Sequence, residues 1–295
     1  MRRKKMNYFY SKNKQKSIEK LVKHSFFSLF IAYMQQHQNE DVILRDLKKA
    51  FSNQKIESFI EDLITEKLLI RNNRRYSLNF SIFDEGEFQE EIKKNVALIL
   101  QWLLPMKQEE RQYVMGEEIW RACFEEEADY FYGTTVDFTS INKQVSGNKT
   151  YQFVSLNSQT TLPFSLANYF YLQKKQFPLP PKFLNLAHLI GDVNEMYYFD
   201  QVEVIIEHIQ AKKYKKRRPS IFFDSLILTN TIKSIAPEEG YQLAIPLIDA
   251  PKKTKDFPKI KLNRTAAENA YIKRSVYEQL FKELSLSDVS YIRKI

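Results

Sequence analysis

The stretch that most constrains the fold of this chain runs from residue 56 to residue 80 and reads IESFIEDLITEKLLIRNNRRYSLNF. Its apolar residues first recur at spacings of three and four, which is typical of a helix with one buried face. From Leu69 they alternate with polar residues around RNNRR, where the two asparagines tolerate the left-handed backbone of a tight turn. The stretch therefore predicts a helix followed directly by a basic hairpin.

Further helices are predicted before this stretch. Apolar residues between Ile18 and Tyr33 lie three or four positions apart, which predicts one amphipathic helix over residues 17–36. The turn-like HQNED precedes ILRDLKKAF, a second and shorter helix. Ser52 and Asn53 are candidate caps for the third helix. The predicted order of elements is helix, helix, helix, hairpin.

This order resembles that of a winged helix-turn-helix domain, and the resemblance covers residues 17–83. In it, DVILRDLKKAF is the first helix of the turn motif, QKIESFIEDLITEKLLI is the recognition helix, and IRNNRRYSLNF is the wing. More loosely, the N-terminal third resembles an uncharacterised family of cytoplasmic proteins from low-GC Gram-positive bacteria, and that resemblance implies no established activity. The fold that these resemblances imply is a winged helix of regulatory type.

Four segments are expected along the chain. Residues 1–16 carry many cations and no acid, so they form a basic arm or a peripheral strand. The winged helix-turn-helix domain at 17–83 follows, then an acidic helical connector at 84–145 and an α+β C-terminal domain of unknown type at 146–295. The fold class expected for the whole chain is mainly α with small β hairpins, with the N-terminal winged helix followed by a mostly helical C-terminal region.

The pattern within residues 146–295 is mixed. Helical runs such as SLANYFYLQKKQF are interrupted by PLPP, and a long apolar-periodic stretch follows it. YQLAIPLI and PKIKLN, on either side of a basic loop, predict a hairpin. Thr265 to Glu268, TAAE, is a capping-box pattern that opens a last helix through Leu284.

An apolar seam runs along residues 84–104, a helix that Pro105 ends. Its members recur every three or four residues and are Phe88, Ile92, Val96, Ile99 and Leu103. Two interpretations stay open. The seam is a dimerisation helix, as in many winged-helix regulators, or it covers the core of its own chain.

No catalytic motif is present. The six glycines do not have the spacing of a dinucleotide fingerprint or a phosphate-binding loop, and no GxSxG occurs. The single cysteine, Cys123, lies in a predicted acidic helix. His188, Asp192 and Glu195 would share one face of a continuous helix, yet salt-bridged surface groups are the preferred interpretation. We expect a non-enzymatic protein with no cofactor and no metal.

Charge is unevenly distributed along the chain. Lys+Arg minus Asp+Glu gives 17 − 8 = +9 for residues 1–83, 6 − 14 = −8 for residues 84–145 and 22 − 14 = +8 for residues 146–295. This uneven distribution of charge suits binding to a polyanionic partner. It is equally explained if the acidic segment packs on one of the basic segments of the same chain.

Candidate nucleic-acid contacts fall into three groups. The wing supplies Arg71, Arg74 and Arg75, the recognition helix supplies Gln54, Lys55 and Ser58, and a dense cation run supplies Lys212, Lys213, Lys215, Lys216, Arg217 and Arg218. Tyr214, inside that run, is a candidate for stacking on a base. Because the helix also carries Glu57, Glu61 and Asp62, which phosphates repel, the wing and the arm cations Arg2, Arg3, Lys4 and Lys5 are the preferred contacts.

The sequence thus predicts a cytoplasmic, non-enzymatic regulatory protein that binds DNA or RNA through the wing, the arm and the basic cluster. One cysteine and no apolar run of 18 residues favour the cytoplasm and no membrane partner. The alternative is an interaction or scaffold protein in which the winged helix does not bind nucleic acid. Its partner is then another protein or a second copy of the chain. An enzyme with an unrecognised site in residues 146–295 is the weakest hypothesis.

Overall fold

The computed structural model describes residues 6–52, 55–125, 128–139, 141–157, 162–215, 218–235, 240–249, 257–258, 260–286 and 288–295, with the side chain of Gln15 left out. The chain divides into two compact units, and neither is continuous in sequence. The first unit comprises Met1–Asn95, Ala122–Phe138 and Ile260–Val276, and the second comprises Val96–Arg121, Thr139–Lys259 and Tyr277–Ile295.

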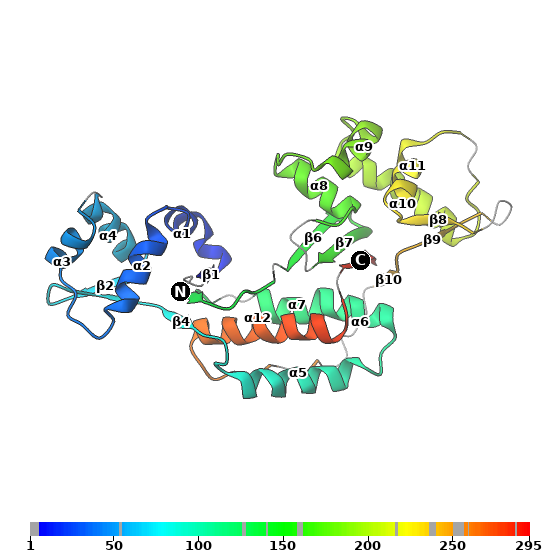
Figure 1. Ribbon diagram of the computed structural model, residues 1–295. Helices are drawn as coiled ribbons and strands as arrows, with labels where there is room; N and C mark the ends of the chain where they lie inside the picture. The colour runs from blue at the N-terminus through cyan, green and yellow to red at the C-terminus, as the bar shows by residue number, and fades with distance from the viewer. Residues whose placement is uncertain are drawn as a thin grey trace. The chain divides into compact units, whose positions relative to one another are not determined.

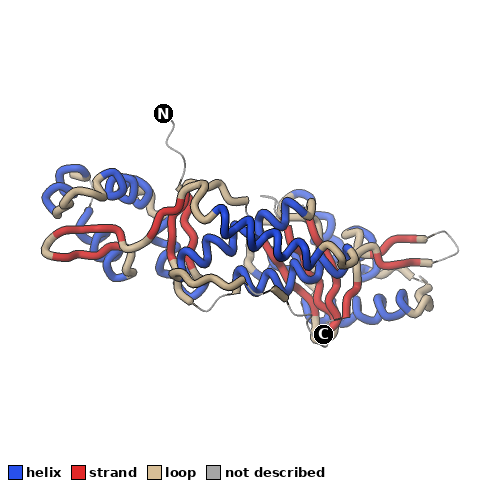
Figure 2. The backbone as a smooth tube through the Cα atoms, turned by 90° about the horizontal axis from the view of Figure 1, so that it is seen from below, coloured by secondary structure: helices blue, strands red, loops and turns tan. Residues whose placement is uncertain are grey.

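The protein is mixed α/β, so the expectation of a mainly α fold with a mostly helical C-terminal region is wrong. Helix accounts for 49% and strand for 18% of the structure, and the described strands form four sheets (Figure 2). The physical reason lies in burial on both faces. All four residues of β5 (Phe131–Thr134) are buried, as are six of the seven in β7 (Tyr151–Asn157), and β5 lacks the polar and apolar alternation that marks a strand in a sequence.

In the first unit four helices precede the hairpin, where three were predicted. Its elements are β1 (Asn7–Tyr10), a 3-10 turn (Lys12–Lys14), α1 (Gln15–Val22), α2 (Phe27–Gln36), α3 (Leu44–Ala50), α4 (Ile56–Thr65), β2 (Leu69–Asn72) and β3 (Arg75–Leu78). The single helix predicted over residues 17–36 is two helices. Between them a nitrogen of the His24 ring accepts a hydrogen bond from the backbone N–H of Phe26 at 3.3 Å, a local contact that favours a turn over a continued helix.

Aromatic side chains form much of the first unit's core. Phe26 of the turn before α2 meets Phe51 edge-on at 4.7 Å and Phe59 of α4 at 5.2 Å between ring centroids. Tyr8 of β1 meets Phe27 of α2 at 4.9 Å. Residues 7–10 of the predicted arm are therefore a strand packed on this core, while Arg2, Arg3, Lys4 and Lys5 lie outside the described residues.

A three-stranded sheet completes the strands of this unit. β5 is its central strand, with β1 antiparallel on one side and β4 (Ser81–Phe83) parallel on the other. The Thr134 hydroxyl donates to the carbonyl oxygen of Phe83 at 2.7 Å and fastens the ends of β5 and β4. Phe131 of β5 contacts Phe80 at 4.7 Å, so a segment more than fifty residues later in sequence belongs to the core of the helix–hairpin region.

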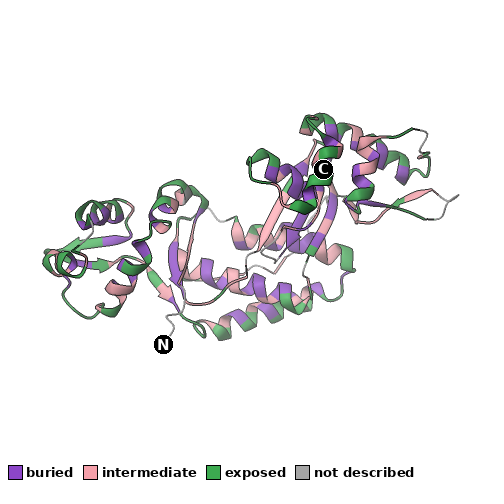
Figure 3. Cartoon of the chain, turned by 45° about the horizontal axis from the view of Figure 1, so that its top comes forward, coloured by how far each residue is buried: buried purple, intermediate pink, exposed green. Residues whose placement is uncertain are grey.

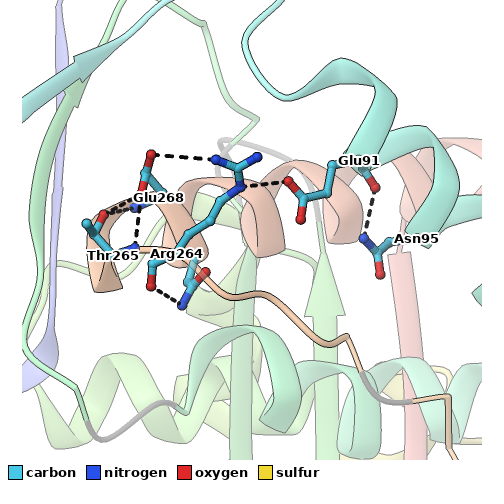
Figure 4. A network of polar contacts seen from close by, with 6 residues as sticks. Glu91, Asn95, Arg264, Thr265 and Glu268 are labelled. Carbon is cyan, nitrogen blue, oxygen red and sulfur yellow. Dashed lines mark hydrogen bonds and ion pairs between the residues drawn. The ribbon is translucent and has the colours of Figure 1, made fainter.

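Two longer helices, α5 (Gln89–Leu103) and α12 (Ala266–Glu283), begin in the first unit. The predicted capping box of α12 is confirmed. The backbone N–H of Thr265 donates to the Glu268 carboxylate at 2.9 Å, and the backbone N–H of Glu268 donates to the Thr265 hydroxyl at 3.3 Å (Figure 4). Just before the cap, Nε of Arg264 donates to the Glu91 carboxylate at 2.8 Å, which ties the start of α12 to α5 (Figure 4).

The second unit is built on a four-stranded sheet with the order β10 (Leu247–Asp249), β11 (Asp288–Lys294), β7 and β6 (Asn142–Gly147). β7 is antiparallel to both of its neighbours, β6 and β11, and β10 lies parallel to β11. The predicted hairpin of YQLAIPLI with PKIKLN is wrong, because β9 (Tyr241–Leu243) pairs with β8 (Ile232–Ser234) and no strand occurs in the described residues of PKIKLN. Pro246 separates β9 from β10, so the two halves of YQLAIPLI join different sheets.

Helices cover one face of this sheet. They are α8 (Leu166–Lys174), α9 (Pro181–Ile190), α10 (Glu195–Gln210) and α11 (Ile221–Leu228), and their apolar residues pack with Tyr151, Phe153 and Ile292 from the strands (Figure 1). Earlier in the chain come α6 (Gln108–Val114), a π-helical segment (Met115–Ile119) and α7 (Trp120–Phe124). Within the described ranges, no helix combines the length and the apolar composition that crossing a membrane would require.

Candidate nucleic-acid interface

The basic hairpin of the first unit turns through a two-residue loop. Asn72 pairs with Arg75, and the two residues between them, Asn73 and Arg74, have φ of +49° and +65°. Positive φ at both central positions is the geometry of a type I′ turn, which matches the twist of the flanking strands. Asparagine suits the first of these positions, and glycine is the favoured residue at the second. The chain has an exposed arginine there instead.

The two faces of the hairpin differ in burial. Leu69 and Tyr76 are buried, whereas the other residues from Ile70 to Ser77 are exposed (Figure 3). Arg71 lies opposite Tyr76 in the strand register, and its guanidinium sits 5.7 Å from the centroid of the tyrosine ring. The tyrosine thus holds the Arg71 cation at the surface by a cation–π contact while its own ring packs on the core.

Arg75 anchors the base of the hairpin. Its guanidinium pairs with the Asp41 carboxylate at 3.0 Å, and Arg75 forms an isolated β-bridge with Ile43. Beside it the Tyr76 N–H donates to the carbonyl oxygen of Val42 at 2.8 Å. Because both members of the ion pair are exposed, the pair adds little stability, and Arg75 can exchange Asp41 for a phosphate at small cost.

The predicted recognition helix, α4, is poorly equipped to read bases. Glu57 forms an ion pair with Lys48 of α3 at 2.5 Å, and the Ser58 hydroxyl donates to the backbone carbonyl of Lys55 at 3.1 Å. Lys55 is exposed at the helix start, and Gln54 lies outside the described residues. The exposed carboxylates of α4 remain, and they repel phosphates. This arrangement leaves the hairpin as the basic part of the region.

The second group of cations belongs to the second unit. Lys212, Lys213, Lys215 and Arg218 are exposed just after α10, while Lys216 and Arg217 lie outside the described residues. Stacking of a base on Tyr214 stays a prediction. Its ring stacks on Phe223 with centroids 4.9 Å apart and planes 7° from parallel, so one ring face that a base would need is already covered. Phe223 belongs to the core of this unit, which gives the ring its partner.

The predicted dimerisation seam is buried within the chain itself. Ile92, Val96, Ile99 and Leu103 are at most 4% exposed. Phe88 is half-buried, and the Arg264 guanidinium lies 4.7 Å from its ring centroid. This burial favours the interpretation in which the helix covers its own core. A dimer through the seam stays a prediction, and it would require these side chains to become exposed.

The structure also locates the candidate metal ligands and the single cysteine. His188 and Glu195 are on different helices, because α9 ends at Ile190 and Gly191 takes a φ of +64°. The face that they were expected to share therefore does not exist. Across the described ranges, no group of three or more His, Cys, Asp or Glu side chains has a metal-binding arrangement. Cys123 is buried.

Sequence reasoning missed a buried ionic network in the second unit. Glu117, only 5% exposed, lies in the π-helical segment, within the acidic residues 84–145. Its carboxylate accepts a hydrogen bond from the Tyr291 hydroxyl at 2.7 Å and pairs with Arg293 at 2.5 Å and Lys143 at 3.3 Å. Burial, and then the neighbouring Glu117 carboxylate, raise the pKa of Tyr291 well above its usual range.

A family model matches the first part of this chain. It is described as a domain of unknown function (DUF1803), and it covers residues 7–115. The match begins at the first residue of β1 and ends at the start of the π-helical segment, so it includes the helices and hairpin described above together with α5 and α6. No curated protein and no solved structure matches the chain significantly.

Proposed function

We propose that residues 17–83 form a winged helix and that the protein is a non-enzymatic regulatory protein that binds nucleic acid through its wing. Helices α1 and α2, a bridge at Ile43, helices α3 and α4 and a two-stranded hairpin follow one another, an order that is similar to that fold. The wing is the β2–β3 hairpin. Cysteine usage supports a cytoplasmic location, because a chain with one cysteine forms no internal disulfide.

The observation that carries this proposal is Arg74 at the tip of the wing. A non-glycine residue in the left-handed region is strained, by about 1–2 kcal/mol, and such strain concentrates at functional positions. Within the described part of the chain, Arg74 has no acidic partner and no hydrogen bond from its side chain. An unpaired cation on a rigid, projecting turn suits a phosphate or a narrow minor groove, and this approach keeps the acidic α4 away from the duplex.

The test is a pair of matched variants. Arg74→Gly removes the cation and relieves the left-handed strain, so we expect a protein that is as stable as the parent or more stable, yet binds nucleic acid about fivefold more weakly. Fluorescence anisotropy with labelled duplex DNA, single-stranded DNA and RNA, each over a salt series, measures the effect. The slope of the logarithm of the association constant against the logarithm of the salt concentration is negative, and it should become shallower by about one unit.

Lys67→Gly is the control. Lys67 is also exposed, cationic and left-handed, with a φ of +57°, but it follows α4 and is not part of the hairpin. We expect this variant to bind like the parent. If the parent shifts none of the three nucleic acids at low salt, nucleic-acid binding is rejected. If Arg74→Gly binds as well as the parent, the wing is not the contact.

A second candidate function is favoured by the acidic surface of α4. Glu61 and Asp62 are exposed there, next to the Glu57–Lys48 ion pair. Such a surface suits a basic protein partner in an interaction or scaffold role. Under this alternative, replacing Glu61 and Asp62 by glutamine and asparagine abolishes capture of the partner, and nucleic acid neither binds nor competes.

A further inference from the structure

The second unit contains a cavity of about 370 Å³ that none of the functions above uses. It lies among the end of α5, α6, the π-helical segment and β10. Much of its wall is apolar and includes Met106, Val114 and Leu247. Two aromatic side chains, Trp102 and Tyr113, also line it. Its volume falls within the range of small-molecule sites, and an apolar wall with a few polar groups is their usual composition.

The charges that line this cavity are mostly negative. Glu109, Glu110, Glu118 and Asp249 contribute carboxylates, and Lys107 contributes one cation. The chain as a whole has a net charge of +9, so this local excess of acid is not a reflection of overall composition. The four carboxylates would repel an anionic ligand, whereas they would attract a cationic ligand.

Glu118 gives the cavity its most specific polar group. Glu118 as a residue is half-buried, and among the described residues its buried Oε2 atom has no hydrogen-bond donor. Burial raises the pKa of Glu118, and the Arg121 cation partly opposes that rise. Glu118 lines the cavity, and a carboxylate that is half removed from water attracts a cation more strongly than a fully solvated one.

The neighbouring glutamate has a different environment. The carboxylate of Glu117 has three donors, from Tyr291, Arg293 and Lys143. Both glutamates lie in the π-helical segment, whose wider turn shifts the side-chain register of the surrounding helix, and such segments are frequent at functional sites. One glutamate thus completes the internal network while the next one lines the cavity.

We propose that this cavity binds an organic ammonium ion with a compact apolar body, held by the Glu118 carboxylate and by the rings of Trp102 and Tyr113. The ammonium group donates to the half-buried Glu118 carboxylate, and the aromatic rings attract a cation through their faces. The apolar walls take the rest of the ligand. A bare metal ion would leave these walls unused. The site is independent of nucleic-acid binding by the wing.

Calorimetric titration of the full chain tests the proposal with three probes of nearly one shape. 2-Phenylethylamine carries a positive charge, 2-phenylethanol is neutral and phenylacetate is negative. We expect the amine to bind about tenfold more tightly than the alcohol, and phenylacetate to bind most weakly. Glu118→Gln should reduce the affinity for the amine to that for the alcohol. Trp102→Leu should reduce the affinity for the amine and the affinity for the alcohol to a similar degree.

Glu207→Gln is the control for charge, because Glu207 is an exposed carboxylate of the same unit that does not line the cavity. We expect it to bind the amine like the parent, and circular dichroism shows whether each variant is folded. The proposal is overturned if the amine does not bind at low salt, or if the alcohol or phenylacetate binds as tightly as the amine. Unchanged amine affinity in folded Glu118→Gln also overturns it.

Discussion

At the scale of single residues, Gly116 and Glu117 show what a linear sequence conceals. Both lie in the acidic residues 84–145, and both are buried. Their partners, Tyr291 and Arg293, lie more than 170 residues later in the chain. Composition and spacing describe neighbours along the helix, whereas burial here depends on a strand at the other end of the sequence. The sequence shows that Glu117 is acidic, but it does not show that the residue is buried or which residues surround it.

Gly116 provides a prediction at this scale. A Cβ atom built on Gly116 would lie 2.2 Å from the Tyr291 hydroxyl oxygen, far inside van der Waals contact. We expect Gly116→Ala to lower the free energy of unfolding by about 1–3 kcal/mol, as overpacking does in a close-packed interior. Urea unfolding at equilibrium measures the change.

Tyr291→Phe tests whether the clash is the cause. It removes the oxygen that the new methyl group would meet, although it also removes the hydrogen bond to Glu117. The double variant Gly116→Ala, Tyr291→Phe should therefore be more stable than the sum of the two single effects predicts. Additive effects in this cycle would mean that the alanine destabilises the protein for another reason.

At the scale of elements, strong local signals predicted structure well. The periodicity of α4 and α5, the RNNRR turn and the TAAE cap all correspond to elements of the structure. Elements whose stability comes from distant partners were missed. β5 is a buried strand of four residues that contains a glycine, and β11 pairs with β7 and β10 from far along the chain. Local propensity carries little information about such pairings.

The α12 cap gives a prediction with a pH dependence. Thr265→Ala removes the hydroxyl that accepts from the Glu268 N–H and donates to the Glu268 carboxylate at 2.8 Å. We expect a loss of about 1 kcal/mol in the free energy of unfolding at neutral pH, the usual effect of losing an N-cap. Urea unfolding of the parent and the variant measures this loss.

The size of that loss should depend on pH in a known direction. Hydrogen bonds from the Thr265 side chain and backbone hold the pKa of Glu268 below its usual value of 4.5. A carboxylate whose pKa is lower in the folded than in the unfolded protein contributes stability that is fully present above its pKa in the unfolded state. That contribution disappears as the pH falls through its pKa in the folded state. The difference between parent and Thr265→Ala should therefore be smaller at pH 3 than at pH 7. A difference that grows on acidification would contradict the hydrogen-bond account.

At the scale of the whole molecule, each compact unit is assembled from three separate segments. The core around the wing includes Phe131, and the sheet of the second unit includes residues close to the C-terminus. Composition suggested boundaries at residues 16, 83 and 145, but composition follows contiguous segments. It does not report which distant segments meet. This is why the helix–hairpin region was predictable while the arrangement of the C-terminal half was not.

Removal of residues 288–295 tests this assembly. β11 pairs with β7 on one side and β10 on the other, so its loss breaks the sheet between two strands. We expect the truncated chain to lose cooperative thermal unfolding of the second unit and to be cleaved rapidly by protease within residues 141–157. Removal of Ile295 alone, which is 63% exposed, is the control and should have little effect. A truncated chain that melts like the parent would contradict the inferred role of β11.

The position of β11 also has a consequence for synthesis on the ribosome. The strand that joins β7 to β10 is translated about 130 residues after β7, so the sheet of the second unit is incomplete until those residues have left the ribosome. Until then β7, which is buried in the finished protein, has an unpaired edge of the kind that leads to aggregation. Production of this protein should therefore depend on chaperone capacity and growth temperature, and its nascent chains should be the species most prone to aggregate.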